Sequence, residues 1–251
     1  MSENQLLLEV ILPAYNKGET IVATVIRLRH FLNELDIDFQ IHIVIDGPDE
    51  YTENALKPFV DSRMRISVFP KNMGKGSALR YGVKQSNSKY IAFLDADLDI
   101  HPNSIGVGLT CLEQSKDGNL VCAYGSKVHI DSKVEYPWFR RLSSSTYRLL
   151  VSVLFGINVK DTQTGLKVFD GKAIREVIDQ SVEQRFLFDL EIFWLLSRNG
   201  YWFVQIPIDL DYQFTSTIGV STISLMIRET FNLARRTRKD LYRTRKRNEL
   251  Q

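Results

Sequence analysis

The stretch YIAFLDADLDIHP, residues 90–102, places a cluster of acidic residues at the end of a short apolar run. Its first five residues are apolar, β-branched or aromatic, which predicts a buried strand. Asp95, Asp97 and Asp99 follow where that strand would stop. In open α/β sheets ligands bind beyond the carboxyl ends of the strands, and carboxylates placed there suit Mg²⁺ or Mn²⁺. The alternative is an acidic, solvated turn or helix cap, because Asp also favours those positions.

Apolar strand patterns alternate with helical patterns on both sides of this stretch. We expect strands at residues 6–12, 39–45, 65–69, 90–94 and 120–126. We expect helices at residues 21–35, 52–60 and 103–114, and another that begins near Ala78, after a glycine-rich loop, and ends near Ser86. Such alternation predicts an α/β fold with a mostly parallel central sheet and helices on both faces.

The strict alternation breaks after residue 126. Helices are expected at residues 136–155, 171–178, 186–199 and 220–247, with strands at 166–169 and 202–208. The last helix has an apolar stripe and a basic face, made by Arg228, Arg235, Arg236, Arg238, Lys239, Arg243, Arg245, Lys246 and Arg247. We therefore divide the chain into a domain at residues 1–215 and an amphipathic basic segment at 216–251, a candidate membrane-surface or partner-binding element. The alternative is that the stripe packs on the domain and the charges are only solvated.

Composition narrows the classes of protein. The formal charge of +2 over 251 residues argues against a nucleic-acid binder. The two cysteines lack the spacing of a zinc site and favour a reducing compartment. The N-terminus has no signal-peptide pattern, and no apolar run reaches the ~20 residues needed to span a bilayer. Any work at a membrane would therefore be done from its surface or through a partner.

Four loops are expected to meet at one edge of the parallel sheet. Together they supply Asp46, Lys75, Asp95 and Asp97. Carboxylates without a Ser/His or Cys/His pair suit the binding of a nucleotide diphosphate through a metal better than hydrolysis by a covalent nucleophile. The glycine-rich loop at residues 72–82 also has a simpler interpretation, a tight turn with a surface lysine.

Seven motifs occur in one order along the chain: VILPAYN (10–16), IDGPDEYT (45–52), NMGKGSALRYG (72–82), FLDADLDIHP (93–102), YGSK (124–127), DTQTGLKVF (161–169) and FLFDLEI (186–192). Together they resemble the family 2 inverting glycosyltransferases of the GT-A fold, and within these the dolichyl- or polyprenyl-phosphate hexose synthases. The DADL and DTQTG motifs are more similar to the glucosyltransferase branch than to the mannosyl branch.

The resemblance implies a metal-dependent, inverting transfer of a hexose from a nucleotide sugar to a polyprenyl- or dolichyl-type lipid phosphate. UDP-glucose is favoured over GDP-mannose as donor. Asp95 and Asp97 would hold Mg²⁺ or Mn²⁺, and Asp99 would assist. The residues implied for the nucleotide site are Pro13, Tyr15, Asn16, Glu19, Asp46, Gly74, Lys75, Asp95, Ala96 and Asp97.

The same resemblance assigns the acceptor side. Lys127, with Arg140 or Arg141, would grip the lipid phosphate, while Asp161 and Gln163 would lie in the acceptor loop. Asp189 and Glu191 would lie near the floor of the active site. The implied catalytic set is therefore Asp97, Lys127, Arg140, Arg141, Asp161 and Gln163.

The sequence departs from the family pattern in two motifs. Lys17 and Gly18 stand where the family usually has acidic residues, and Ile45 and Pro48 replace the first aspartate and the serine of the second motif. The expected location is peripheral, on the cytoplasmic face of a membrane, held by the basic helix or by a membrane-embedded subunit. A soluble or saccharide acceptor, or a catalytically weak nucleotide-sugar-binding subunit, is the alternative.

Overall fold

The computed structural model describes residues 6–18, 20–97, 99–116, 118–132, 138–185, 187–210 and 220–238. Within its two long helices, the description of side chains begins at Tyr147 and at Ile227. Glu19 and residues 239–251 lie outside the described residues, and so do the side chains of Arg140 and Arg141.

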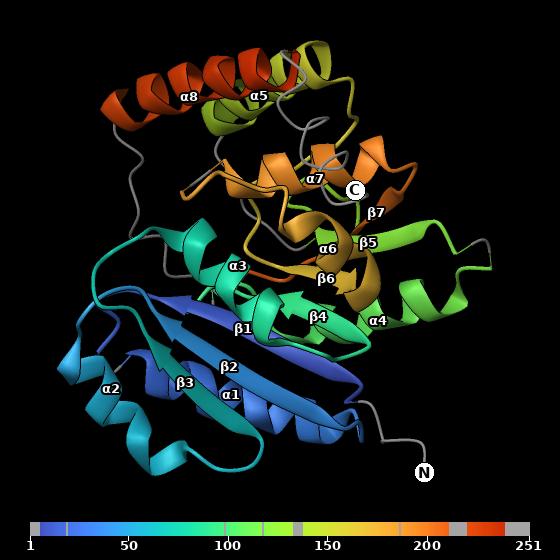
Figure 1. Cartoon of the computed structure of the whole chain (residues 1–251). Helices are drawn as coiled ribbons and strands as arrows, with labels where there is room; N and C mark the ends of the chain where they lie inside the picture. The colour runs from blue at the N-terminus through green and yellow to red at the C-terminus, as the bar shows by residue number, and fades with distance from the viewer. Residues whose placement is uncertain are drawn as a thin grey trace, which may run out of the picture.

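The strands form one mostly parallel sheet, as the alternating pattern predicts (Figure 1). β6 runs antiparallel to both of its neighbours, and the other strand pairs are parallel. The order across the sheet is β3 (Met64–Val68), β2 (Phe39–Ile45), β1 (Leu8–Ala14), β4 (Tyr90–Phe93), β6 (Lys167–Asp170), β5 (Leu120–Gly125) and β7 (Trp202–Ile206).

Helices cover both faces of the sheet because its central strands are apolar on both faces. Along β1, Val10 and Leu12 are buried in one core cluster, and Ile11 between them is buried in the other. The Val10 face packs against α1 (Thr20–Glu34), α2 (Glu50–Leu56) and α4 (Asn103–Gln114). The Ile11 face packs against α3 (Lys75–Gln85), α6 (Gly171–Ile178) and α7 (Phe188–Arg198). A short 3-10 turn, η1 (Lys57–Phe59), ends α2 at a proline.

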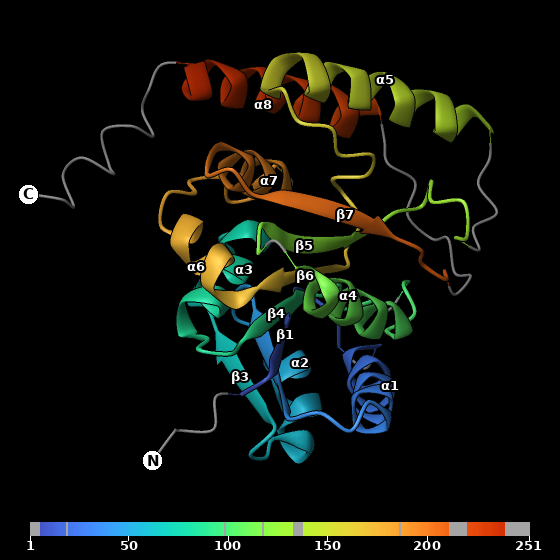
Figure 2. The same cartoon turned by 90° about the vertical axis from the view of Figure 1, so that its right-hand side faces the viewer.

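Two long helices, α5 (Trp138–Phe155) and α8 (Val220–Arg238), lie side by side beyond α7 (Figure 2). Val151 of α5 and Leu233 of α8 are buried in the same core cluster as α7. The Tyr147 and Thr230 hydroxyls are 3.1 Å apart and join the two helices. No helix within the described ranges is both long and apolar enough to span a lipid bilayer. The division of the chain at residue 215 stays a prediction.

Helix α3 begins at Lys75, three residues earlier than the glycine-rich sequence suggests. Gly74 precedes it with a φ of 95°, a conformation that glycine adopts without strain. Gly76 lies inside the helix, and a Cβ there would overlap Phe188 of α7. The glycines thus allow close packing of α3 where their helix propensity predicts a loop.

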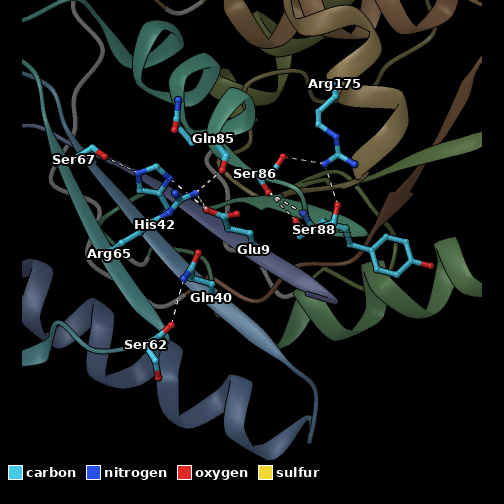
Figure 3. Close-up of polar contacts among 11 residues, drawn as sticks. Glu9, Gln40, His42, Ser62, Arg65, Ser67, Gln85, Ser86, Ser88 and Arg175 are labelled. Atoms are coloured by element: carbon cyan, nitrogen blue, oxygen red, sulfur yellow. Dashed lines mark hydrogen bonds and ion pairs between the residues drawn. The ribbon is translucent and has the colours of Figure 1, made fainter. Parts of the chain in front are cut away.

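A buried polar network joins β1, β2 and β3 below the last turn of α3 (Figure 3). Arg65 donates to Glu9 Oε1 at 2.6 Å and to the Gln85 carbonyl at 3.0 Å. His42 Nε2 lies 2.9 Å from Ser67 Oγ, and His42 Nδ1 lies 3.4 Å from Glu9 Oε1. Burial opposes ionisation of Glu9, but hydrogen bonds from His42, Ser86 and Arg65 hold the pKa of Glu9 below its ordinary value. The network ties the last turn of α3 to the sheet. The first turn of α3, which begins at Lys75, lies at the other end of this helix.

Candidate active site

The carboxyl ends of β1, β2 and β4 lie next to one another at one edge of the sheet. Ala14 pairs with Ile45 in register, and Ile11 pairs with Phe93. The Asp46 amide then donates to the Ala14 carbonyl at 2.8 Å, just beyond the strands. The loops that follow these strands therefore meet in space, as a parallel sheet requires.

Asp46 holds the loop that leads into α3. Its Oδ1 accepts the Met73 amide at 2.6 Å, and its Oδ2 accepts the Gly74 amide at 2.8 Å. Hydrogen bonds to a charged carboxylate are among the stronger ones in proteins. Asp46 thus positions the first turn of α3, and its predicted contact with a nucleotide stays a prediction.

Lys75, the first residue of α3, reaches the carboxylate at the end of β4. Its Nζ lies 2.5 Å from Asp95 Oδ1, and about a third of each side chain is exposed. Desolvation lowers the pKa of Lys75, but the charges of Asp95 and Asp189 raise it overall. Desolvation likewise opposes ionisation of Asp95, and Lys75 outweighs it, so the pKa of Asp95 is lowered. Both groups are therefore charged at neutral pH.

Asp97 is two residues after Asp95, and its side chain faces Lys17 in the loop that follows β1. Its Oδ2 is 3.5 Å from Lys17 Nζ. Between the two aspartates, the carbonyl of the buried Ala96 accepts a hydrogen bond from Thr24 Oγ1 of α1 at 2.8 Å. Desolvation and the charge of Asp97 raise the pKa of Asp99. The acidic stretch is thus a turn in which Asp95 and Asp97 each pair with a lysine, while Asp97 and Asp99 stay exposed, and its use as a metal site stays a prediction.

The loop at residues 161–165, which carries the DTQTG motif, packs against this turn. A Cβ on Gly165 would overlap the Asp95 carboxylate, so glycine permits the close approach. At the start of the same loop, Asp161 Oδ2 accepts a hydrogen bond from the Lys127 amide at 3.2 Å. Gln163 is partly buried in this loop. The structure therefore brings the predicted donor residues and the predicted acceptor loop together.

The remaining predicted residues fall in two groups, those that follow β1 and those outside the described part of the chain. Pro13 is partly buried, while Tyr15 and Asn16 are exposed at the end of β1. Glu19 lies outside the described residues, as do the side chains of Arg140 and Arg141, so their roles stay predictions.

A buried ion pair supports the site from below. Lys167 Nζ lies 3.0 Å from Asp189 Oδ1, with 1% and 6% of the side chains exposed. Lys167 also donates to the Thr164 carbonyl, next to Gly165. The charge of Lys167 helps lower the pKa of Asp95, and that of Asp189 helps raise the pKa of Lys75. The motifs alone assign no role to Lys167, although a lysine within the apolar sequence TGLKVF indicates a buried partner.

Glu191 differs from Asp189 in what it contacts. Its Oε2 accepts the amides of Val182 and Glu183 at 2.9 and 2.8 Å. Glu191 therefore holds the loop that precedes α7, whereas Asp189 acts on the charged groups of the site.

The carboxylate oxygens of Asp95 and Asp97 fit a divalent cation that is also bound by a ligand. Within the described part of the chain, no three His, Cys, Asp or Glu side chains gather to hold a metal by themselves. Asp95 and Asp97 supply two carboxylates, and Mg²⁺ typically combines one or two carboxylates with phosphate and water oxygens.

The mostly parallel sheet with helices on both faces defines the fold class, the GT-A fold. The chain belongs to glycosyl transferase family 2, which it matches over residues 9–182.

Curated relatives within this class share about a quarter of their residues with the chain. The dolichyl-phosphate beta-glucosyltransferase of Dictyostelium discoideum is 26% identical over 207 residues, which cover 78% of this chain and 63% of that protein. The enzyme of the same name from Saccharomyces cerevisiae is 28% identical over 225 residues, covering 82% and 67%. The human one is 25% identical over 217 residues, covering 80% and 64%. The chain thus spans only about two thirds of the length of these relatives.

Solved structures with the same fold are more distant in sequence. Glucosyl-3-phosphoglycerate synthase from Mycobacterium tuberculosis, in complex with phosphoglyceric acid, superposes with a TM-score of 0.67 at 16% identity. The match covers 91% of this chain and 78% of that one. The same enzyme has been solved with Mn²⁺, uridine diphosphate and glucosyl-3-phosphoglycerate, with a TM-score of 0.67 at 16% identity and coverage of 92% and 79%. At these identities the likeness establishes the fold alone.

Proposed function

We propose that this chain catalyses a metal-dependent, inverting transfer of a hexose from a nucleotide sugar to a polyprenyl- or dolichyl-type lipid phosphate. UDP-glucose is the favoured donor, because the curated relatives are named as glucosyltransferases. The observation that carries the proposal is the close approach of Gly165 to Asp95. It joins the acidic turn, proposed for the donor, to the loop at residues 161–165, proposed for the acceptor.

On the donor side, Asp95 and Asp97 would hold the cation and Lys75 would contribute positive charge toward the diphosphate. Pro13, Tyr15, Asn16, Glu19 and Asp46 remain proposed contacts to the nucleoside. A bound Mg²⁺ or Mn²⁺ would stabilise the negative charge that develops on the leaving diphosphate. Lys75 is already fixed at the first turn of α3, so little reorganisation is needed when that charge develops.

On the acceptor side, the chain needs to align and neutralise a phosphate more than to deprotonate it. A phosphate monoester has a second pKa of about 6, so its oxygens are nucleophilic at neutral pH without a strong general base. Lys127 is held beside Asp161 by its own amide and would bind this phosphate, together with Arg140 or Arg141. Gln163 would lie against the acceptor. A single in-line displacement then inverts the anomeric carbon.

The outer helices provide a surface for a lipid. Among the side chains that the structure describes on these helices, Leu149 and Val153 of α5 and Ile227 and Phe231 of α8 are apolar and exposed. Arg228, Arg235 and Arg238 are exposed on α8 as well. Apolar and basic side chains on one layer suit the interface of an anionic membrane. We therefore propose a peripheral position on the cytoplasmic face, with the basic helix or a membrane-embedded subunit as the anchor.

The test is a transfer assay with purified protein, Mn²⁺ or Mg²⁺, and a panel of donors and acceptors. UDP-glucose and GDP-mannose are each combined with a short-chain polyprenyl phosphate or with a soluble phosphate monoester. The expected result is lipid-linked hexose from UDP-glucose, and its loss in Asp97→Ala.

The control is Lys84→Met, which removes a lysine–aspartate pair at the far end of α3 and is expected to keep full activity. Transfer only to the soluble acceptor would move the assignment to that substrate class. Donor binding without transfer to any acceptor would favour the binding-subunit alternative.

A further inference from the structure

Lys17 is held in a defined position by the loop on either side of it. Asn16 and Gly18 both have positive φ, 51° and 45°, and a Cβ on Gly18 would overlap the Tyr51 ring. The Gly18 amide donates to Thr52 Oγ1 at 2.8 Å, and the Lys17 carbonyl accepts the Thr20 amide at 3.0 Å. The backbone at Lys17 is therefore fixed by its contacts with α1 and α2.

The second motif of the chain supports this loop. Asp49 caps α2, because its carboxylate accepts both the amide and the hydroxyl of Thr52, at 3.0 and 2.5 Å. The same hydroxyl accepts the Gly18 amide. The sequence IDGPDEYT thus builds the platform for Lys17, even though it lacks the first aspartate of the family pattern.

Lys17 points at the carboxylates proposed for the metal. Its Nζ lies 3.5 Å from Asp97 Oδ2, with 30% and 45% of the side chains exposed, and its charge also lowers the pKa of Asp95. Asp95 is paired with Lys75. Each of the two carboxylates therefore has its own lysine ammonium before any cation binds.

We infer that Lys17 binds the diphosphate of the nucleotide-sugar donor, and that without donor it competes with a divalent cation for Asp97. An ammonium beside Asp97 repels an incoming cation, which weakens binding of the metal alone. The diphosphate of a bound donor brings negative charge to both the Lys17 ammonium and the cation. Lys17 can then contact a phosphate oxygen beside the metal. The inference rests on the proposed donor site and adds to it a residue that the family pattern does not provide.

The two effects have opposite signs, which separates them from loss of folding. An exposed or half-exposed ion pair contributes up to about 1 kcal/mol, so Lys17→Met should bind Mn²⁺ alone up to about fivefold more tightly. A hydrogen bond to a charged group contributes about 1.5 kcal/mol or more, so the same variant should bind UDP with Mn²⁺ about tenfold more weakly. A misfolded variant would lose both.

The experiment measures Mn²⁺ binding by electron paramagnetic resonance and UDP binding by calorimetry, with and without Mn²⁺, on the full chain. Lys17→Arg keeps the charge and is expected to behave like the wild type. Lys84→Met removes a surface lysine–aspartate pair elsewhere and is expected to change neither affinity.

Unchanged affinities in Lys17→Met would overturn the inference while leaving the donor site in place. A wild-type chain that binds no UDP with Mn²⁺ would overturn the proposed donor site and the role of Lys17 together.

Discussion

Replacing Lys167 tests whether the ion pair below the site is part of its support. In Lys167→Met, Asp189 loses a partner at 3.0 Å while its side chain stays 6% exposed, and the Thr164 carbonyl loses a donor. Breaking a buried pair from one side costs about 3–5 kcal/mol. Because the charge of Lys75 still acts on Asp189, we expect the lower end, about 3 kcal/mol. For a chain of this size the melting temperature then falls by about 6–12 °C.

Urea unfolding of the single and double variants measures this coupling. Asp189→Leu should cost a similar free energy, whereas Lys167→Met with Asp189→Leu should recover most of it, because an apolar pair can replace a buried ion pair. Lys84→Met is the surface control, and its pair with Asp179 should contribute less than about 1 kcal/mol. A loss in Lys167→Met no larger than in that control would refute the reasoning.

Three further predictions follow from the contacts of Gly165, Asp46 and Glu9. Gly165→Ala should lower the transfer rate by about 100-fold, because a Cβ displaces the Asp95 carboxylate. Gly106→Ala, whose Cβ would meet the flexible end of Leu35 and the Phe31 ring at an ordinary contact distance, should remain near wild type, and equal rates in the two variants would disprove the contact. Asp46→Ala should destabilise the chain by about 2–3 kcal/mol and speed hydrogen exchange at the Met73 and Gly74 amides, and unchanged exchange there would argue against its positioning role. The pKa of Glu9 is lowered from 4.5, so its contribution to stability is fully present above that pH and is lost as the pH falls through the lower folded value. Glu9→Gln should therefore show a shallower fall of the unfolding free energy between about pH 5 and pH 2, and parallel curves would contradict this.

Periodicity alone predicted much of the fold. The helices expected at residues 103–114 and 171–178 have those bounds in the structure, since apolar spacing and clear turn residues mark both ends. The turn after β4 followed from the end of the apolar run, and the rule that ligands bind at the carboxyl ends of parallel strands made it the candidate site. Strand direction beyond residue 126 did not follow, because the antiparallel placement of β6 between β4 and β5 depends on packing between distant segments.

The site was less accessible from the sequence, because its contacts join residues far apart in the chain. Lys17 stood out only as a departure from the family pattern, and its partner Asp97 depends on the positive φ values around it. Lys167 lay within a recognised motif, but its partner Asp189 is on another element. Helix α3 began early because packing against Phe188 outweighs the low helix propensity of glycine.

The proposed inverting transfer is tested most directly by the anomeric configuration of the product made from UDP-glucose, Mn²⁺ and a polyprenyl phosphate. Nuclear magnetic resonance of the purified lipid distinguishes the two anomers. We expect a β-linked glucosyl phosphate from the α-linked donor, and no such product from Asp97→Ala. An α-linked product, release of free glucose in place of a lipid product, or an undiminished rate in Asp97→Ala would contradict it.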